Sequence, residues 1–270
     1  MRPLPSESFD GRQALVIGAG VGGLACAMRL QASGLQVTLL ERQAAPGGKM
    51  RTLPSAAGPV DAGPTVLTLR PVFEELFDAC GTRLADHVSL IRQDVRARHF
   101  WPDGAMLDLH EDPHRSAQAI EAFGNTRDRA DFERFWDETE RLFEAFEGPM
   151  MLAAEPSRLD LAAQVLRAPA LLRAMAPRAT MASRLAQRFG DPRLAQLFGR
   201  YATYVGGMPD RAPALLSLIW QAEARGVWHV AGGMHKLAEA MAAQYVAMGG
   251  VLRTGAEVAA ITVENGAVCG

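Results

Sequence analysis

The sequence predicts an α/β protein in which a parallel-sheet unit is interrupted by a long, mostly helical insertion. A strand, a glycine-rich turn, a helix and a second strand follow one another over residues 13–41. The middle of the chain shows helical periodicity, most clearly over 132–146. After Gly226 a short strand leads to a helix near 234–247. Because strands that alternate with helices are typical of a parallel sheet, the two ends of the chain are expected to form one Rossmann-like domain.

The expected domain boundaries follow from this alternation. Residues 1–75 and 225–270 are assigned to the Rossmann-like domain and residues 76–224 to the insertion. The insertion contains a hairpin over 95–110, turning at Pro102-Asp103-Gly104. Apolar positions at helical spacing then predict helices at 132–146, 158–168, 181–189, 192–204 and 213–224.

Two dipeptides set expected helix boundaries within the insertion. Gly148-Pro149 is expected to end the helix over 132–146, whose aromatic face from Phe132 to Phe146 is interpreted as core. Asp191-Pro192 is a good helix start, because aspartate caps the free amides and proline fits the first helical position.

Composition excludes several classes of protein. The chain has 270 residues, of which 49% are hydrophobic and 21% charged, with a net charge of -2. Such a chain gives no reason to expect a nucleic-acid partner. Three cysteines without CxxC spacing indicate neither a disulfide framework nor a metal site. No signal-peptide-like stretch or transmembrane helix is visible, so we expect a cytoplasmic protein.

The first thirty residues contain the strongest motif. An apolar strand over 13–17 is read as buried and is followed by Gly18-Ala-Gly-Val-Gly-Gly23, after which Leu24, Ala27 and Met28 fall at helical spacing. A dinucleotide pyrophosphate needs backbone amides that it can approach closely and a helix N-terminus aimed at its charge. Gly18, Gly20, Gly22 and Gly23 satisfy this need, so they are predicted to bind a dinucleotide.

An acidic residue and a second glycine pair complete the predicted dinucleotide site. Glu41 ends the second strand, over 37–40, where its carboxylate can accept hydrogen bonds from ribose hydroxyls. FAD and NAD both fit this pattern. Gly47 and Gly48, followed by a cation at Lys49 or Arg51, can fold back onto the same phosphates and favour FAD, although an ordinary basic loop is the alternative. Arg42, next to Glu41, is also predicted to contribute to the FAD site.

At this point the sequence resembles the flavin amine oxidase and phytoene desaturase superfamily, whose opening combines GxGxxG, an acid and GGK or GGR. The segment from Asp61 to Leu67, with Thr65, resembles the one that passes near the flavin ring in that family. The segments 201–207, 212–214 and 226–228 resemble the family's stretch between the substrate region and the return to the flavin domain. The glycine pair and helix start at 232–237 resemble the returning motif itself. The resemblance implies that the backbone of Val258 meets the adenine side of FAD.

Within this superfamily the segments 99–104, 191–201 and 219–223 are most similar to the 1-hydroxycarotenoid 3,4-desaturases. The resemblance implies FAD-dependent removal of two hydrogens from an acyclic carotenoid that carries a hydroxyl or methoxyl group. A polyene is insoluble in water, so it also implies peripheral attachment to the inner membrane, and residues 159–176 are the candidate segment. A pair of buried core helices is the alternative for that segment.

The sequence does not fix catalytic residues. Glu223 and Arg200 are weak candidates because they lie in apolar helices, where pKa shifts are expected; a structural ion pair is the alternative. His110 and His114 flank Asp112-Pro113, which indicates a loop and no metal site. His235 is expected to cap or pack at a helix start. The oligomeric state is not indicated.

Other functions stay open on the sequence alone. A carotenoid isomerase, an amine oxidase, a protoporphyrinogen oxidase or a non-enzymatic lipid-binding protein could use the same fold. The final expected hairpin turns at Asn265-Gly266, four residues before the last one. A doubly wound sheet that stops there has too few strands to close its core, so we expect an incomplete domain, with a natural terminus as the alternative.

Overall fold

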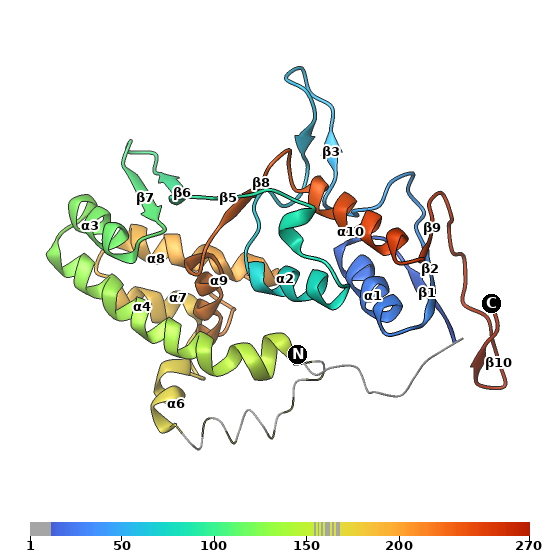
Figure 1. The fold of residues 1–270 in the computed structure, drawn as a ribbon. Coiled ribbons are helices and arrows are strands. Elements are labelled where there is room, and N and C mark those ends of the chain that lie inside the picture. Colours follow the sequence, from blue (N-terminus) through green and yellow to red (C-terminus); the bar gives the residue numbers. More distant parts are fainter. Residues whose placement is uncertain are drawn as a thin grey trace. The chain divides into compact units, whose positions relative to one another are not determined.

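The protein is described from a computed structural model. The structure describes residues 12–153 and 168–270 and, between these ranges, only residues 155, 157, 159, 163 and 165. The described chain forms two compact units (Figure 1). We call residues 12–92 and 228–270 the sheet unit, and residues 93–227 the helical unit. The expected domain boundaries near residues 75 and 225 stay a prediction.

The sheet unit is built on the predicted strand–helix–strand pattern. Strands β1 (Gln13–Ile17) and β2 (Gln36–Leu40) are parallel, with Gln13 opposite Gln36 and Ile17 opposite Leu40, and α1 (Val21–Ala32) connects them. Strand β9 (Val251–Arg253) adds to β2, giving the order β1-β2-β9. The sequence analysis did not assign β9, because three residues are too few to show a periodicity.

One part of the prediction for β1 is wrong. The strand forms, but it is not buried: Leu15 is 62% and Ile17 51% exposed. Within the sheet β1-β2-β9, the alternate side chains Val37 and Leu39 of β2 are covered. An apolar run therefore predicted the strand correctly and its burial incorrectly, because burial depends on which other elements cover the face.

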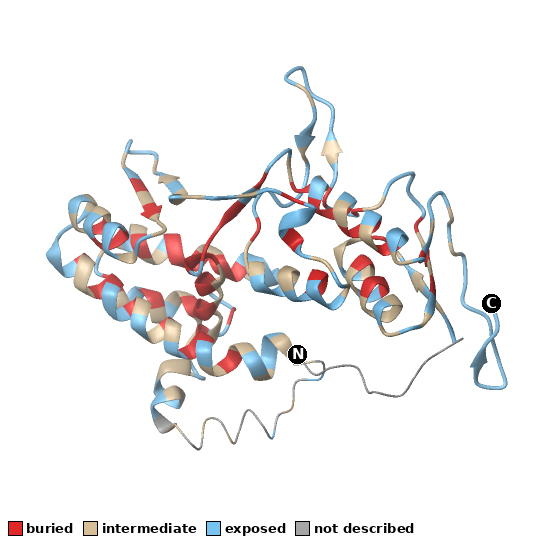
Figure 2. Ribbon diagram, in the orientation of Figure 1, coloured by how far each residue is buried: buried red, intermediate tan, exposed pale blue. Residues whose placement is uncertain are grey.

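Helix α10 (His235–Ala247) packs beside α1 and closes the core of the sheet unit. Tyr245 ties this helix to the sheet, because its buried hydroxyl donates to the backbone oxygen of Val37 at 2.6 Å. Figure 2 shows the buried side of both helices in red. The fully covered side chains of this core include Leu24, Met28, Leu39, Phe77, Leu237, Met241 and Tyr245.

Shorter elements complete the sheet unit. Strand β8 (Trp228–Val230), which the sequence predicted, pairs antiparallel with β5 (Leu90–Arg92). The turn at Asn265-Gly266 connects two strands as expected, but each has two residues and both are exposed. The remaining elements are β3 (Thr52–Leu53), β4 (Val60–Asp61), α2 (Arg70–Ala79), η1 (Leu84–Asp86), β10 (Val263–Glu264) and β11 (Ala267–Val268).

The helical unit begins with the predicted hairpin, β6 (Val95–Phe100) and β7 (Met106–His110). Its helices are α3 (Pro113–Phe123), α4 (Thr126–Phe146), the π-helix η2 (Glu147–Leu152), α6 (Pro169–Met175), α7 (Met181–Arg188), α8 (Pro192–Gly199), η3 (Arg200–Val205), η4 (Ala214–Ile219) and α9 (Trp220–Ala224). The helix expected at 158–168 lies mostly outside the described residues, as does the first part of the candidate membrane segment 159–176.

The aromatic face of α4 forms the core of the helical unit, as predicted. Phe132 and Phe135 are buried and pack against Phe198 and Trp220 in stacked, tilted and edge-on pairs, with ring centroids 4.6–6.0 Å apart. Each aromatic side chain removes a large apolar area from water, so this cluster supplies much of the unit's stability.

Two proline-containing dipeptides behave differently from expectation. The predicted end at Gly148-Pro149 is wrong in part: α4 ends at Phe146, but the chain continues as a π-helix to Leu152. The predicted loop at Asp112-Pro113 is confirmed in part: Glu111 and Asp112 separate His110 at the end of β7 from His114, so the two do not share a helix face. The loop is shorter than expected, because Asp112 accepts from the amide of His114 and Pro113 begins α3. The same cap-plus-proline arrangement was correctly predicted at Asp191, whose carboxylate accepts from the amide of Arg193.

Candidate dinucleotide site

The glycine turn between β1 and α1 has the close contacts that its sequence predicts. Gly18 has a φ of +94° and donates its amide to the Leu40 oxygen at 2.7 Å. A Cβ on Gly23 would lie 1.8 Å from the Gly18 oxygen, so only glycine allows the helix to pack on this turn. By contrast, a Cβ on Gly20 or Gly22 would meet no protein atom within 4 Å. The space before α1 is therefore open for a ligand.

Glu41 holds the turn in place from the end of β2. Its side chain is buried, with Oε2 accepting from the Ala19 amide at 2.7 Å and Oε1 from the Gln43 amide at 2.8 Å. Each carboxylate oxygen has a further lone pair. The contact to a ribose stays a prediction, and the carboxylate's support of the backbone is a second role that sequence spacing did not reveal.

The second glycine pair lies directly against the first turn. The Gly47 amide donates to the Ala19 oxygen at 2.7 Å, and a Cβ on Gly48 would lie 3.1 Å from the Gly20 Cα. Gly47 and Gly48 both have positive φ angles, of +119° and +57°. This folding back, which the sequence analysis expected, brings the cations that follow the glycines to the open end of the turn.

An open pocket of about 540 Å³ lies beside these two turns. Its lining contains one acid, Glu41, and three cations, Arg42, Lys49 and Arg51. A surplus of positive charge beside close-approach glycines and a helix N-terminus suits a pyrophosphate. The residues present therefore fit the dinucleotide part of FAD.

Thr65 and Val258 are placed apart from this lining. Thr65 is exposed and precedes Leu67, which pairs through both backbone groups with Trp228. Val258 is half-buried in the segment that follows β9. Their contacts with FAD stay predictions, since both were proposed for parts of the cofactor other than the pyrophosphate.

Asp61 is a positioning residue that sequence reasoning did not single out. Its Oδ2 accepts from the Met234 amide at 2.9 Å, and its Oδ1 lies 3.4 Å from His235 Nδ1. The carboxylate thus fixes the segment that contains Thr65 to the start of α10. His235 packs at this helix start, as expected. The sequence around Asp61 offered one signal, a carboxylate followed by Ala-Gly-Pro. It could not reveal the partner, because Met234 lies 173 residues away.

The two catalytic candidates form one network in the helical unit. Arg200 Nη2 donates to Glu223 Oε2 at 2.7 Å, and the Tyr201 hydroxyl donates to the same oxygen at 2.6 Å. The Tyr204 hydroxyl donates to Glu223 Oε1. Burial of Tyr201, followed by the negative charge of Glu223, raises the pKa of its hydroxyl. The phenol therefore stays a hydrogen-bond donor. The fully partnered carboxylate favours the structural alternative; a catalytic role stays a prediction.

The charges of Arg200 and Glu223 in this network also act on His99 of β6. His99 begins the segment 99–104 of the family resemblance, but no sequence pattern indicated this environment. Burial, and next the positive charge of Arg200, lower the pKa of His99 to about 4, whereas Glu223 and Asp108 act in the opposite direction. Its Nε2 is buried without a hydrogen-bond partner among the described residues. His99 is therefore neutral at neutral pH.

This shift predicts acid sensitivity. The pKa of His99 is lower in the folded than in the unfolded chain, so the unfolded state takes up the proton first as the pH falls. As the pH falls from about 6.5 to about 4, the free energy of unfolding is expected to decrease by at most about 3 kcal/mol. His99→Gln should remove this contribution to the pH dependence of stability. Urea unfolding of the full-length protein at several pH values measures it. His114→Gln, at an exposed position in the same unit, is the control. An unchanged slope in His99→Gln would contradict the assignment.

The fold and this site define a class of protein. The chain belongs to the flavin containing amine oxidoreductase family, whose model matches residues 21–269. A solved oxidoreductase from Methanosarcina mazei shares the fold, with a TM-score of 0.64 and 19% identity over 96% of this chain and 55% of that chain. The predicted α/β fold class and the resemblance to this superfamily are confirmed, and membership supports FAD as the cofactor.

Within this family, the chain is similar to two carotenoid-modifying enzymes. A hydroxyneurosporene desaturase from Cereibacter sphaeroides is 52% identical over 256 residues, which make up 95% of this chain and 52% of the relative. Another from Rhodobacter capsulatus is 50% identical over 254 residues, or 94% of this chain and 51% of the relative. The chain thus spans about half the length of these relatives. Among the residues that the structure describes, no helix is long and apolar enough to cross a membrane.

Proposed function

We propose that the protein containing this chain is an FAD-dependent carotenoid desaturase. It removes two hydrogens from an acyclic carotenoid with a hydroxyl or methoxyl group and so extends the polyene. The observation that carries the proposal is the identity of 52% and 50% to two hydroxyneurosporene desaturases across nearly the whole chain. The glycine turns and the cationic pocket support it, because they supply the cofactor site that such an oxidation needs.

Bound FAD would accept a hydride from the carotenoid while the second hydrogen leaves as a proton, so that a single bond becomes a double bond. The residues of this chain hold the cofactor. The amides at the start of α1 would hold the pyrophosphate, and Lys49 and Arg51 would offset its charge. Glu41 keeps the turn in shape and offers its remaining lone pairs to the ribose.

The proposed substrate class also suggests where the protein works. A long polyene is insoluble in water, so the enzyme must take it from a bilayer. We propose a cytoplasmic protein that associates peripherally with the inner membrane. Exposed apolar side chains of the helical unit support this location, among them Met150, Met151, Leu159 and Leu172.

One assay separates this function from its alternatives. The full-length protein, loaded with FAD, is incubated with hydroxylated neurosporene and related acyclic carotenoids, and product mass and absorption are measured. We expect a red-shifted product two hydrogens lighter, absent without FAD. A shifted spectrum with unchanged mass indicates an isomerase. Bound FAD without any carotenoid product favours an amine or protoporphyrinogen oxidase, and a folded protein that never binds FAD favours a lipid-binding role.

A further inference from the structure

An arginine-rich hollow on the helical unit lies outside the dinucleotide site. It has a volume of about 220 Å³ and is lined by residues of α4, α6 and α7. Three of its lining residues are arginines, Arg141, Arg173 and Arg184, and a single lining residue, Glu138, is acidic. We call this feature the arginine pocket.

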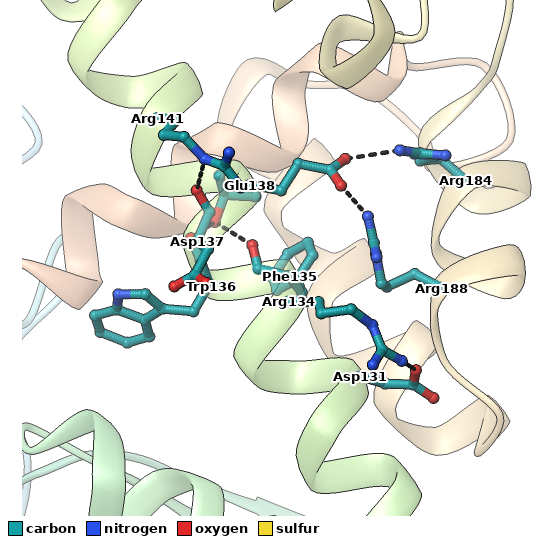
Figure 3. Close-up of polar contacts among 10 residues, drawn as sticks. Asp131, Arg134, Phe135, Trp136, Asp137, Glu138, Arg141, Arg184 and Arg188 are labelled. Atoms are coloured by element: carbon teal, nitrogen blue, oxygen red, sulfur yellow. Dashed lines mark hydrogen bonds and ion pairs between the residues drawn. The ribbon is translucent and has the colours of Figure 1, made fainter. Parts of the chain in front are cut away.

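The single acid of the arginine pocket is already neutralised. Glu138 Oε1 accepts from Arg184 Nη2 at 2.9 Å, and Oε2 accepts from Arg188 (Figure 3). Two guanidinium groups on one carboxylate leave a net positive charge. Burial, and then the nearby positive charge of Arg134, lower the pKa of Arg188.

The remaining donors of the pocket are available to an anion. Arg141 donates its Nε to the backbone oxygen of Asp137, and neither Arg141 nor Arg173 forms an ion pair with any carboxylate that the structure describes. The Nε of Arg184 is buried and has no partner among the described residues. Guanidinium groups in such an arrangement suit a phosphate, which accepts several charge-assisted hydrogen bonds at once.

The surroundings of the pocket are apolar, which distinguishes a lipid from a soluble phosphate. Ala170, Leu171 and Ala174 of α6 line it between the arginines. Leu172 in the same helix is 51% exposed. Arginines beside exposed apolar side chains are typical of a surface that lies in the headgroup region of a bilayer.

We propose that the arginine pocket binds the phosphate of an anionic phospholipid and so seats the helical unit on the membrane surface. The proposal rests on the proposed function only in that a desaturase must reach a membrane substrate. A net charge of -2 gives the whole chain no general attraction to an anionic bilayer. Specific local charge is therefore needed, and the lining of the arginine pocket, with three arginines and one glutamate, supplies it.

Vesicle co-sedimentation of the full-length, FAD-loaded protein tests the proposal. We expect binding to vesicles that contain phosphatidylglycerol, weak binding to phosphatidylcholine alone, and a decrease at high salt. Arg173→Gln should lower the partition coefficient about 5-fold and Arg141→Gln with Arg173→Gln about 30-fold, since a basic residue near the surface contributes about 1 kcal/mol. Arg127→Gln, at an exposed position about 20 Å along α4 from Arg141, should have no effect.

The outcomes separate this inference from the proposed function. Circular dichroism and flavin content first show that each variant is folded. Binding of the double variant equal to wild type, or equal binding of wild type to both kinds of vesicle, would overturn the lipid site. The lipid site would also be overturned if the wild-type protein bound inorganic phosphate but no vesicles and the double variant lost the phosphate binding, because the pocket would then bind a soluble phosphate. Desaturation of a detergent-dispersed carotenoid is independent of the pocket, so its failure would count against the proposed function alone.

Discussion

Gly20→Val is expected to abolish FAD retention and leave the protein folded. A Cβ at this position meets no protein atom within 4 Å, and Gly20 has an ordinary φ of -69°. The valine side chain instead enters the space in front of α1, where the proposed site would bring the pyrophosphate close to the backbone amides. We expect the affinity for FAD to fall at least about 100-fold, which is about 2.7 kcal/mol. Flavin absorbance after gel filtration and titration calorimetry of the apoprotein measure it.

Two other glycine substitutions define what this result means. Gly148→Val is the matched control, because its Cβ also meets nothing within 4 Å and it lies in the helical unit. It should retain FAD. Gly23→Ala places its Cβ 1.8 Å from the Gly18 oxygen, so it should lower the melting temperature as well as flavin content. Full flavin retention by folded Gly20→Val protein would refute the assignment of this turn to the cofactor.

Glu223→Ala is expected to cause a large loss of stability in the helical unit. The carboxylate is buried and accepts from Arg200, Tyr201 and Tyr204. Its removal leaves a guanidinium and two hydroxyl groups without their acceptor. The Arg200 side chain is one-third exposed, so we expect about 3 kcal/mol, the lower end of the cost of breaking a buried pair. Urea unfolding at neutral pH measures this value.

The amide variant separates structure from catalysis at this residue. Glu223→Gln keeps one acceptor oxygen and should lose less stability, about 1–2 kcal/mol. If it stays folded, binds FAD and desaturates normally, Glu223 has only a structural role. If it stays folded and loses turnover at unchanged KM, the carboxylate takes part in the reaction. Glu144→Ala, at a surface acid whose side chain is 64% exposed, should change stability by less than about 0.5 kcal/mol.

Local signals predicted the dinucleotide-binding unit well. A glycine turn, the helix after it and the acid at the end of the next strand act over short separations, so β1, α1, β2 and the place of Glu41 could be read directly. The same holds for the β6–β7 hairpin and the aromatic face of α4. In each case the residue pattern and the backbone geometry are linked by neighbouring residues.

Contacts between distant segments were not predictable in this way. Asp61 reaches the start of α10, β9 joins the sheet beside β2, and the charges of Arg200 and Glu223 act on His99 of another element. None of these residues carries a periodicity or motif that names its partner. The arginine pocket is a further example, because its arginines are spread over three helices.

The sequence by itself determined the α/β class, the dinucleotide turn and the resemblance to carotenoid desaturases, since each depends on residue types at fixed short spacings. Only the tertiary structure decided that Glu41 supports the backbone of the turn, that one face of β1 is exposed, and that Glu223 is fully hydrogen-bonded. The physical reason is that burial and polar partners are properties of the assembled chain: a carboxylate acquires its role from the donors that folding brings to it.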